Sequence, residues 1–316
     1  IVAEHGVPYI ITGASTPTIT QRTDIDTGTM FHYCPTTDDY GEQTTLFVDD
    51  VIRDAINVRF GYSDSRPLRL ALLVQDSPYG KGVQKAVKDT IVKRNLNIVI
   101  VAEETFKMGE TDFRTALTSI KAAQPDVVYP AAFLNEQIPM VTQARRDVGL
   151  NTIFLAVECN DDPDYYEGLG RYGEYSIIET RFSPYAIPRG DIADDMAAFR
   201  ENFQKRWGSY PGMMGASTYE GVYIAARAVE EAGTREKEKV NAALDALSMP
   251  QMIEAMKGGV ITFTDDFREA KFDLYMEQLI WNETSQELRP VIVWPDHMKE
   301  ADFVLPAWYV PGPALP

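Results

Sequence analysis

Four apolar runs in this sequence each stop at a short polar loop that leads towards a predicted helix. The runs cover residues 7–11, 70–74, 127–129 and 153–157. Continuous apolar runs are typical of strands in a parallel sheet that helices cover on both faces. Because stretches of helical periodicity alternate with these runs, the sequence predicts an α/β fold with right-handed crossovers between parallel strands.

Periodicity and turn residues predict the remaining elements. Pro184, Pro188 and Gly190 indicate a connector between domains over residues 182–190. The end of the chain, residues 290–316, has little periodicity, and we expect it to wrap over a surface instead of adding to a core. Apolar spacing predicts helices at residues 44–58, 81–94, 136–148, 192–207, 215–232 and 240–256, and strands at 97–102, 175–178, 260–263 and 271–281.

Length and charge narrow the classes of function. The 316 residues are enough for two domains with a large core. The 47 acidic residues outnumber the 30 lysines and arginines and give a net charge of −17. Such a charge repels phosphate backbones and anionic lipids, so we expect neither a nucleic acid partner nor a membrane surface partner. The sequence has no apolar stretch of the roughly 18 residues that would cross a bilayer.

The sequence has no familiar signature of catalysis or cofactor binding. The patterns GxGxxG, GxxxxGK[ST] and GxSxG are absent, and the histidines, His5, His32 and His297, are isolated from one another. We therefore predict no catalytic residue, no cofactor and no metal site. Cys34 and Cys159 show no CxxC spacing, and the sequence leaves open whether they pair.

Polar and aromatic residues follow the apolar runs at the place where parallel sheets bind ligands, beyond the carboxyl ends of their strands. Ser15 offers a hydroxyl and neighbouring backbone N–H groups that suit a carboxylate. Glu158 ends the fourth run, and a carboxylate there needs a partner because burying it alone is costly. A ligand ammonium and a structural arginine or lysine both fit this role. The candidate site residues are Gly13, Ala14, Ser15, Tyr79, Phe133 and Glu158.

Seven short stretches stand in an order that one known family shares. The first is VPYIITGASTPTIT at residues 7–20. The others are FHYCPTTDDYG (31–41), DSPYGKG (76–82), DFRTAL (112–117), QARRDVGL (143–150), YEGVY (219–223) and VWP (293–295). Together they resemble the type I periplasmic substrate-binding proteins, in particular those of the branched-chain amino acid (Leu/Ile/Val) ABC transporters.

The resemblance implies two lobes, each a parallel sheet flanked by helices, which three strands join at a hinge. Lobe one would take residues 1–36 and 184–275, and lobe two residues 37–183 and 276–316. Family members carry a further segment before the position where this sequence starts, so we expect the N-terminal part of lobe one to be absent from it. We therefore expect the candidate site to be incomplete and lobe one to expose the edge of its sheet.

The resemblance also implies a role for the matching site residues. Gly13 and Ser15 match positions that hold the α-carboxylate of an amino acid, Glu158 matches the partner of its α-ammonium, and Tyr79 matches a ring that encloses the ligand. Phe133 stands where amino acid binders often carry tyrosine, which removes one hydroxyl from the site.

The function that the resemblance implies is a non-enzymatic receptor that captures a small zwitterion, in the first place a branched-chain or related amino acid. It would work in the periplasm or outside the cell, with a lipid anchor on the missing N-terminus as an option, and would deliver its ligand to an ABC permease. Asp161 and Asp162 would add negative potential, so an amine is an alternative ligand, as are a small amide and an aromatic acid. The alternatives from other classes are a ligand-sensing module of a signalling receptor and an enzyme on the same scaffold.

Overall fold

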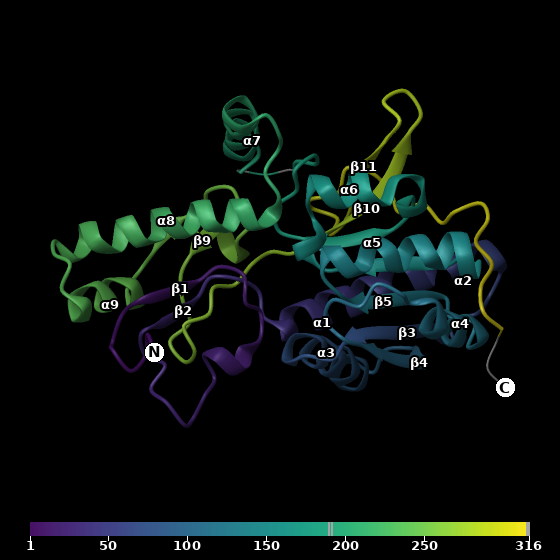
Figure 1. Cartoon of the computed structure of the whole chain (residues 1–316), viewed down its shortest axis with the longest axis horizontal. Helices are drawn as coiled ribbons and strands as arrows, with labels where there is room; N and C mark the ends of the chain where they lie inside the picture. Colours follow the sequence, from purple (N-terminus) through teal and green to yellow (C-terminus); the bar gives the residue numbers. More distant parts are fainter. Residues whose placement is uncertain (189, 191, 314–316) are drawn as a thin grey trace.

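The computed structural model describes residues 1–188, 190 and 192–313, and its larger part is a sheet covered by helices (Figure 1). In these residues seven strands pair in the order β11-β10-β7-β6-β5-β3-β4. The pairs from β4 to β7 are parallel, whereas β10 is antiparallel to both of its neighbours, so the predicted α/β fold with a mainly parallel sheet is confirmed. The strands are β3 (Leu68–Gln75), β4 (Ile98–Phe106), β5 (Val127–Ala131), β6 (Ile153–Ala156), β7 (Ile177–Thr180), β10 (Tyr275–Asn282) and β11 (Glu287–Trp294).

Helices bury both faces of this sheet, which is why its central strands are mainly apolar on both faces. Leu72 and Val74 of β3 belong to one core, whereas Ala71 and Leu73 belong to the other. The alternation follows from the two-residue period of a strand. The first core is covered by α1 (Thr37–Phe47), α2 (Asp54–Phe60) and α3 (Pro78–Arg94), and the second by α4 (Arg114–Ala122), α5 (Leu134–Gln143) and α6 (Pro163–Leu169).

A smaller part of the molecule lies beside the large sheet and has its own core, in which Phe31, Ile224, Leu244 and Phe263 pack together (Figure 1). The chain crosses between the two parts after β2, after β7 and before β10. None of the described helices is both long and apolar enough to cross a membrane. The elements of this part are β1 (Tyr9–Ile11), β2 (Met30–His32), α7 (Ala193–Trp207), α8 (Met213–Ala232), α9 (Lys237–Asp245), β8 (Met249–Pro250) and β9 (Val260–Ile261).

Two helix boundaries differ most from the prediction. Helix α1 begins at Thr37 instead of residue 44, because Thr36 and Asp39 form a capping box. The Asp39 carboxylate accepts from the Thr36 N–H at 2.8 Å, and the Thr36 hydroxyl accepts from the Asp39 N–H at 3.4 Å. Helix α9 ends at Asp245 instead of residue 256, and the chain then enters β8, where Pro250 is unable to continue a helix.

The prediction that residues 290–316 add nothing to a core is wrong at its start. Residues 287–294 form β11, the edge strand of the large sheet, in which Leu288, Pro290 and Ile292 are buried. An edge strand tolerates proline because one row of its N–H groups has no partner in the sheet. The predicted lobe boundaries stay a prediction. Residue 189 of the predicted connector and residues 314–316 of the predicted tail lie outside the described residues.

Candidate functional site

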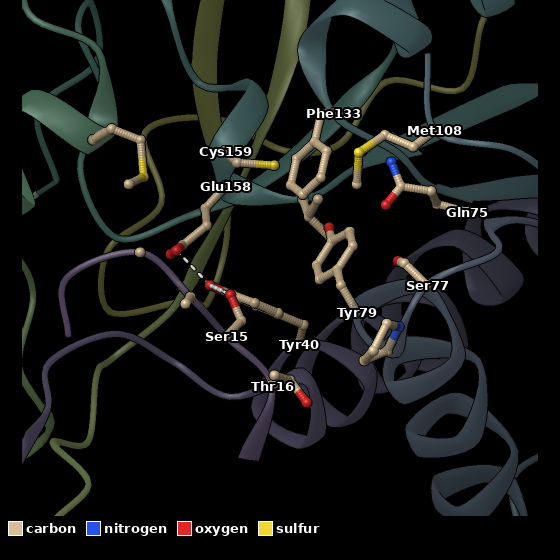
Figure 2. Close-up of a pocket in the computed structure, with 15 residues that line it drawn as sticks. Ser15, Thr16, Tyr40, Gln75, Ser77, Tyr79, Met108, Phe133, Glu158 and Cys159 are labelled. Carbon is tan, nitrogen blue, oxygen red and sulfur yellow. Dashed lines mark hydrogen bonds between the residues drawn. The ribbon is translucent and has the colours of Figure 1, made fainter. Parts of the chain in front are cut away.

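All six candidate residues from the sequence line one cavity of about 370 Å³ (Figure 2). The loop after β1 supplies three of them, and the segments after β3, β5 and β6 supply one each. The wall therefore comes from both parts of the molecule. That these residues bind a ligand stays a prediction. They are Gly13, Ala14, Ser15, Tyr79, Phe133 and Glu158, and the other lining residues are Thr16, Tyr40, Gln75, Ser77, Pro78, Met108, Val157, Cys159 and Met214.

Strand β2 and helix α1 hold the loop that carries Ser15. The backbone N–H of Thr37, at the start of α1, donates to the Ser15 carbonyl at 2.9 Å. The Nε2 atom of His32 lies 2.8 Å from the Ala14 carbonyl oxygen. Because that oxygen only accepts, Nε2 carries the proton. Burial lowers the pKa of His32, so this imidazole is neutral and its hydrogen bond fixes the loop without adding charge.

A chain of hydrogen bonds links Ser15 to Glu158 along one side of the cavity (Figure 2). The Ser15 hydroxyl donates to the Tyr40 hydroxyl at 3.4 Å, and the Tyr40 hydroxyl donates to Glu158 Oε1. Tyr40 lies on α1 and is fully buried, whereas Glu158 follows β6. Burial raises the pKa of Tyr40 well above its usual value, with Glu158 acting in the same direction, so this hydroxyl keeps its proton. The three side chains thus form one polar end of the cavity.

Glu158 has a structural arginine as its partner. Nη1 of Arg181 lies 2.5 Å from both carboxylate oxygens of Glu158, and its Nε lies 3.0 Å from Glu254 Oε1. Nη2 donates to the Ser217 hydroxyl on α8 at 2.5 Å. Arg181 is completely buried, and its guanidinium carbon lies 4.5 Å from the centre of the Phe272 ring. One buried guanidinium therefore joins segments of both parts of the molecule and serves two carboxylates.

Burial and this pairing act in opposite directions on the charge of Glu158. Burial raises the pKa of Glu158 to about 7, and Arg181 and Tyr40 limit the rise. Burial alone would lower the pKa of Arg181, but Glu158 and Glu254 outweigh it and raise this pKa further. The guanidinium is therefore always charged, whereas Glu158 gains its full negative charge only as the pH rises through neutrality.

An aromatic wall follows the polar end of the cavity. The rings of Tyr79 and Phe133 stack with their centres 5.0 Å apart and their planes 12° from parallel (Figure 2). Tyr79 lies in the first turn of α3, which Ser77 caps by accepting from the Gly80 N–H at 3.2 Å. A Cβ atom at Gly80 would lie 2.1 Å from the Gln75 carbonyl oxygen, so glycine lets α3 begin directly against the end of β3.

The sequence analysis missed several residues of the site, although some of them stand at strand ends, where it could have found them. Gln75 and Ser77 follow the same apolar run as Tyr79, and Arg181 follows β7, so the rule of strand ends applied to all three. Tyr40 had no such signal because it reaches the cavity from within helix α1 and not from a strand end. In the described residues Cys34 and Cys159 are both free thiols.

Asp161 and Asp162 are not among the residues that line the cavity. Asp161 is buried, and its Oδ1 lies 2.5 Å from the Tyr166 hydroxyl, which also lies 2.6 Å from Glu277 Oε1. Since Tyr166 has one proton to donate, two hydrogen bonds at its oxygen require that one of the two carboxyls is protonated. Asp162 caps α6 by accepting from the Asp164 N–H at 2.9 Å.

Because of this buried pair of carboxyls, we expect the stability of the folded protein to depend on pH, and Glu277→Gln should reduce this dependence. Burial raises the pKa of Glu277 from 4.5 to about 7, so the folded protein holds a proton that the unfolded chain has lost. Stability from this group is then lost as the pH rises, by about 1 kcal/mol between pH 6 and pH 8. Glutamine keeps a donor without a charge, so urea unfolding of the variant should show a smaller loss over this range.

The matched control is Glu287→Gln on the neighbouring strand β11, where the carboxylate is half-exposed and pairs with Arg289. This variant should keep the pH dependence of the parent protein. Equal pH dependence in the Glu277 variant and the parent would show that Glu277 is ionised in the folded protein throughout the range.

Comparison of this sequence with known proteins identifies its family. The family model for periplasmic binding proteins matches residues 1–283. The Leu/Ile/Val-binding protein of Escherichia coli (strain K12) is 33% identical over 93 residues, which cover 29% of this chain and 24% of that relative. The Leu/Ile/Val-binding protein homolog 7 of Brucella suis biovar 1 is 22% identical over 266 residues, which cover 79% of this chain and 58% of that relative. The chain thus matches less than two thirds of the length of either relative.

Solved structures share the fold. A leucine binding protein, LivK, from Thermotoga maritima has a TM-score of 0.72 at 18% identity, over 94% of this chain and 76% of its own. The solute binding protein of an ABC transporter from R. palustris, in complex with benzoate, also has a TM-score of 0.72, at 15% identity, over 96% of this chain and 75% of its own. The family and these neighbours are binding proteins and not enzymes.

Proposed function

Because the chain belongs to the type I periplasmic binding proteins, we propose that it captures a small zwitterionic solute, an amino acid. The observation that carries this proposal is a cavity in which a hydroxyl loop and a buried carboxylate, Ser15 and Glu158, lie at the same polar end. The loop suits a carboxylate, and Glu158 suits an ammonium. A ligand that contacts both parts of the molecule would favour their closed arrangement.

Charge favours a ligand with a positive group. Among the described residues the buried cluster has one guanidinium, Arg181, against the carboxylates of Glu158 and Glu254, so one negative charge has no matching cation there once Glu158 is ionised. Among the lining residues that the structure describes there is no lysine, arginine or histidine. An ammonium beside Glu158 would balance the excess charge, whereas a ligand with only a carboxylate would meet repulsion.

An aromatic acid is the second candidate, because the stacked rings of Tyr79 and Phe133 offer a flat apolar wall. The R. palustris neighbour was solved with benzoate. The two candidates differ in the ammonium group, and this difference makes them separable by experiment.

A thermal-shift screen over the amino acids, simple amines, amides and benzoate tests the proposal. A ligand that binds the folded protein raises its melting temperature, and the rise grows with the logarithm of the ratio of ligand concentration to dissociation constant. We expect at least one amino acid to raise it, the corresponding amine without a carboxylate to raise it less, and benzoate to leave it unchanged. A rise with benzoate alone would replace the amino acid by an aromatic acid.

We further propose that the protein works in the periplasm or outside the cell and passes its ligand to an ABC permease. Family membership supports this role over the sensing alternative. Genes for a permease and an ATPase beside the gene of this protein would support import. A neighbouring gene for a receptor kinase or cyclase would favour the sensing module.

A further inference from the structure

The end of the cavity away from Glu158 also carries polar groups. In Figure 2, Glu158, Ser15 and Tyr40 lie at one side of the stacked rings, whereas Gln75 and Ser77 lie at the other side. A ligand whose head group meets Glu158 would extend its side chain along the rings towards Gln75. The far end is therefore the place where ligand side chains are distinguished.

Gln75, the last residue of β3, is completely buried there and has an unused acceptor. Its Nε2 donates to Glu136 Oε1 at 3.3 Å, and this contact fixes which end of the amide faces Glu136. Its Oε1 has no hydrogen-bond partner among the described residues. A buried acceptor without a partner has lost its hydrogen bond to water, so a ligand donor that reaches it gains binding free energy.

The described residues at the far end have no free charge to offer a ligand. Glu136 is buried, and its Oε1 accepts from the Gly109 N–H at 2.9 Å while its Oε2 accepts from the Phe133 N–H at 3.1 Å. Together with Gln75 these donors occupy the carboxylate. The groups left for a ligand are therefore uncharged: the Gln75 carbonyl oxygen and the Ser77 hydroxyl, whose oxygen accepts from Gly80.

We infer that Gln75 selects amino acids whose side chain ends in an uncharged hydrogen-bonding group, an amide or a hydroxyl, over purely aliphatic ones. This inference rests on the proposed amino acid function. A cavity built to hydrogen-bond a ligand group discriminates strongly against the analogue without it, because its own buried group is then left unpaired. Aliphatic side chains would fill the aromatic middle of the cavity but leave Gln75 without a partner.

Titration calorimetry with side-chain pairs of nearly equal shape tests this inference. The pairs are asparagine with leucine, glutamine with methionine, and threonine with valine. In the pair that the parent protein binds most tightly, the polar member should bind at least about tenfold more tightly than the apolar one. Gln75→Met should bring that ratio to about one or below. Gln84→Met, at a partly exposed position of α3 that does not line the cavity, should leave the ratio unchanged.

Tighter or equal binding of the apolar member by the parent protein overturns the inference while the amino acid function stands. An unchanged ratio in the Gln75 variant overturns the role of Gln75. Absence of binding for all six amino acids overturns this inference, and the thermal-shift screen over the other amino acids then decides separately whether the proposed function stands. The comparison in the parent protein decides the matter even if the Gln75 variant does not fold.

Discussion

Replacing Arg181 with methionine is expected to lower the free energy of unfolding by about 3–5 kcal/mol at pH 8. The guanidinium is completely buried and is the cation that pairs with both Glu158 and Glu254. Methionine fills part of the space but leaves two buried carboxylates without a counter-ion. Urea unfolding followed by tryptophan fluorescence measures the loss.

The loss should be smaller at pH 5.5 than at pH 8. Without Arg181, burial would raise the pKa of Glu158 above its present value of about 7, so this carboxyl can stay protonated and neutral at the lower pH. The stability of the variant relative to the parent protein should therefore fall as the pH rises. Stability falls with rising pH for any carboxyl whose pKa is higher in the folded state than in the unfolded state.

Arg145→Met is the matched control. Arg145 lies 4.6 Å from the ring of Trp308 and donates to the Leu150 carbonyl, and no carboxylate pairs with it among the described residues. Its replacement should lower stability by an amount that is the same at both pH values. A loss for Arg181→Met that is also independent of pH would mean that the guanidinium stabilises by packing and not by pairing with the carboxylates.

Continuous apolar strands made most of the large sheet predictable. β3, β5 and β6 are buried on both faces, so their positions are apolar or nearly so except for Arg69 and Gln75 near the two ends of β3, and no choice of register was needed to find them. The elements that were predicted wrongly depend on features outside their own stretch of sequence. Pro290 is easily accommodated because β11 lies at an edge, and the start of α1 depends on a side chain reaching back to a backbone N–H.

The site shows the same division between local and long-range information. The ends of parallel strands meet at one edge of a sheet, so a local rule found residues that line a single cavity. The same rule brings Arg181 to this edge, but it does not predict that Arg181 pairs with Glu158. Tyr40 and Arg181 reach it from 118 and 23 residues away, and Glu254 shares the same guanidinium from 73 residues away. Which of two suitable partners a carboxylate takes is set by packing, so the sequence left both open.

Glu158→Gln is expected to weaken binding of an amino acid by about 2–5 kcal/mol, or roughly 30- to 5,000-fold. The carboxylate lines the cavity, and glutamine would remove the charge that attracts the ligand ammonium while keeping the shape. In the parent protein the affinity should also rise roughly fivefold to tenfold from pH 6 to pH 7.5, because Glu158, with a pKa of about 7, ionises over this range. Titration calorimetry at both pH values should show this rise in the parent protein and not in the variant.

Glu254→Gln separates a direct contact with the ligand from an effect on folding. Glu254 pairs with the same guanidinium as Glu158, is equally buried and does not line the cavity. Both substitutions remove one carboxylate from Arg181, so both should lower the free energy of unfolding. Only the change at position 158 should also cause the large loss of affinity. If the two variants weaken binding equally, or if Glu158→Gln binds amino acids as the parent protein does, then Glu158 serves as a counter-ion of Arg181 and the ligand ammonium is held by another group.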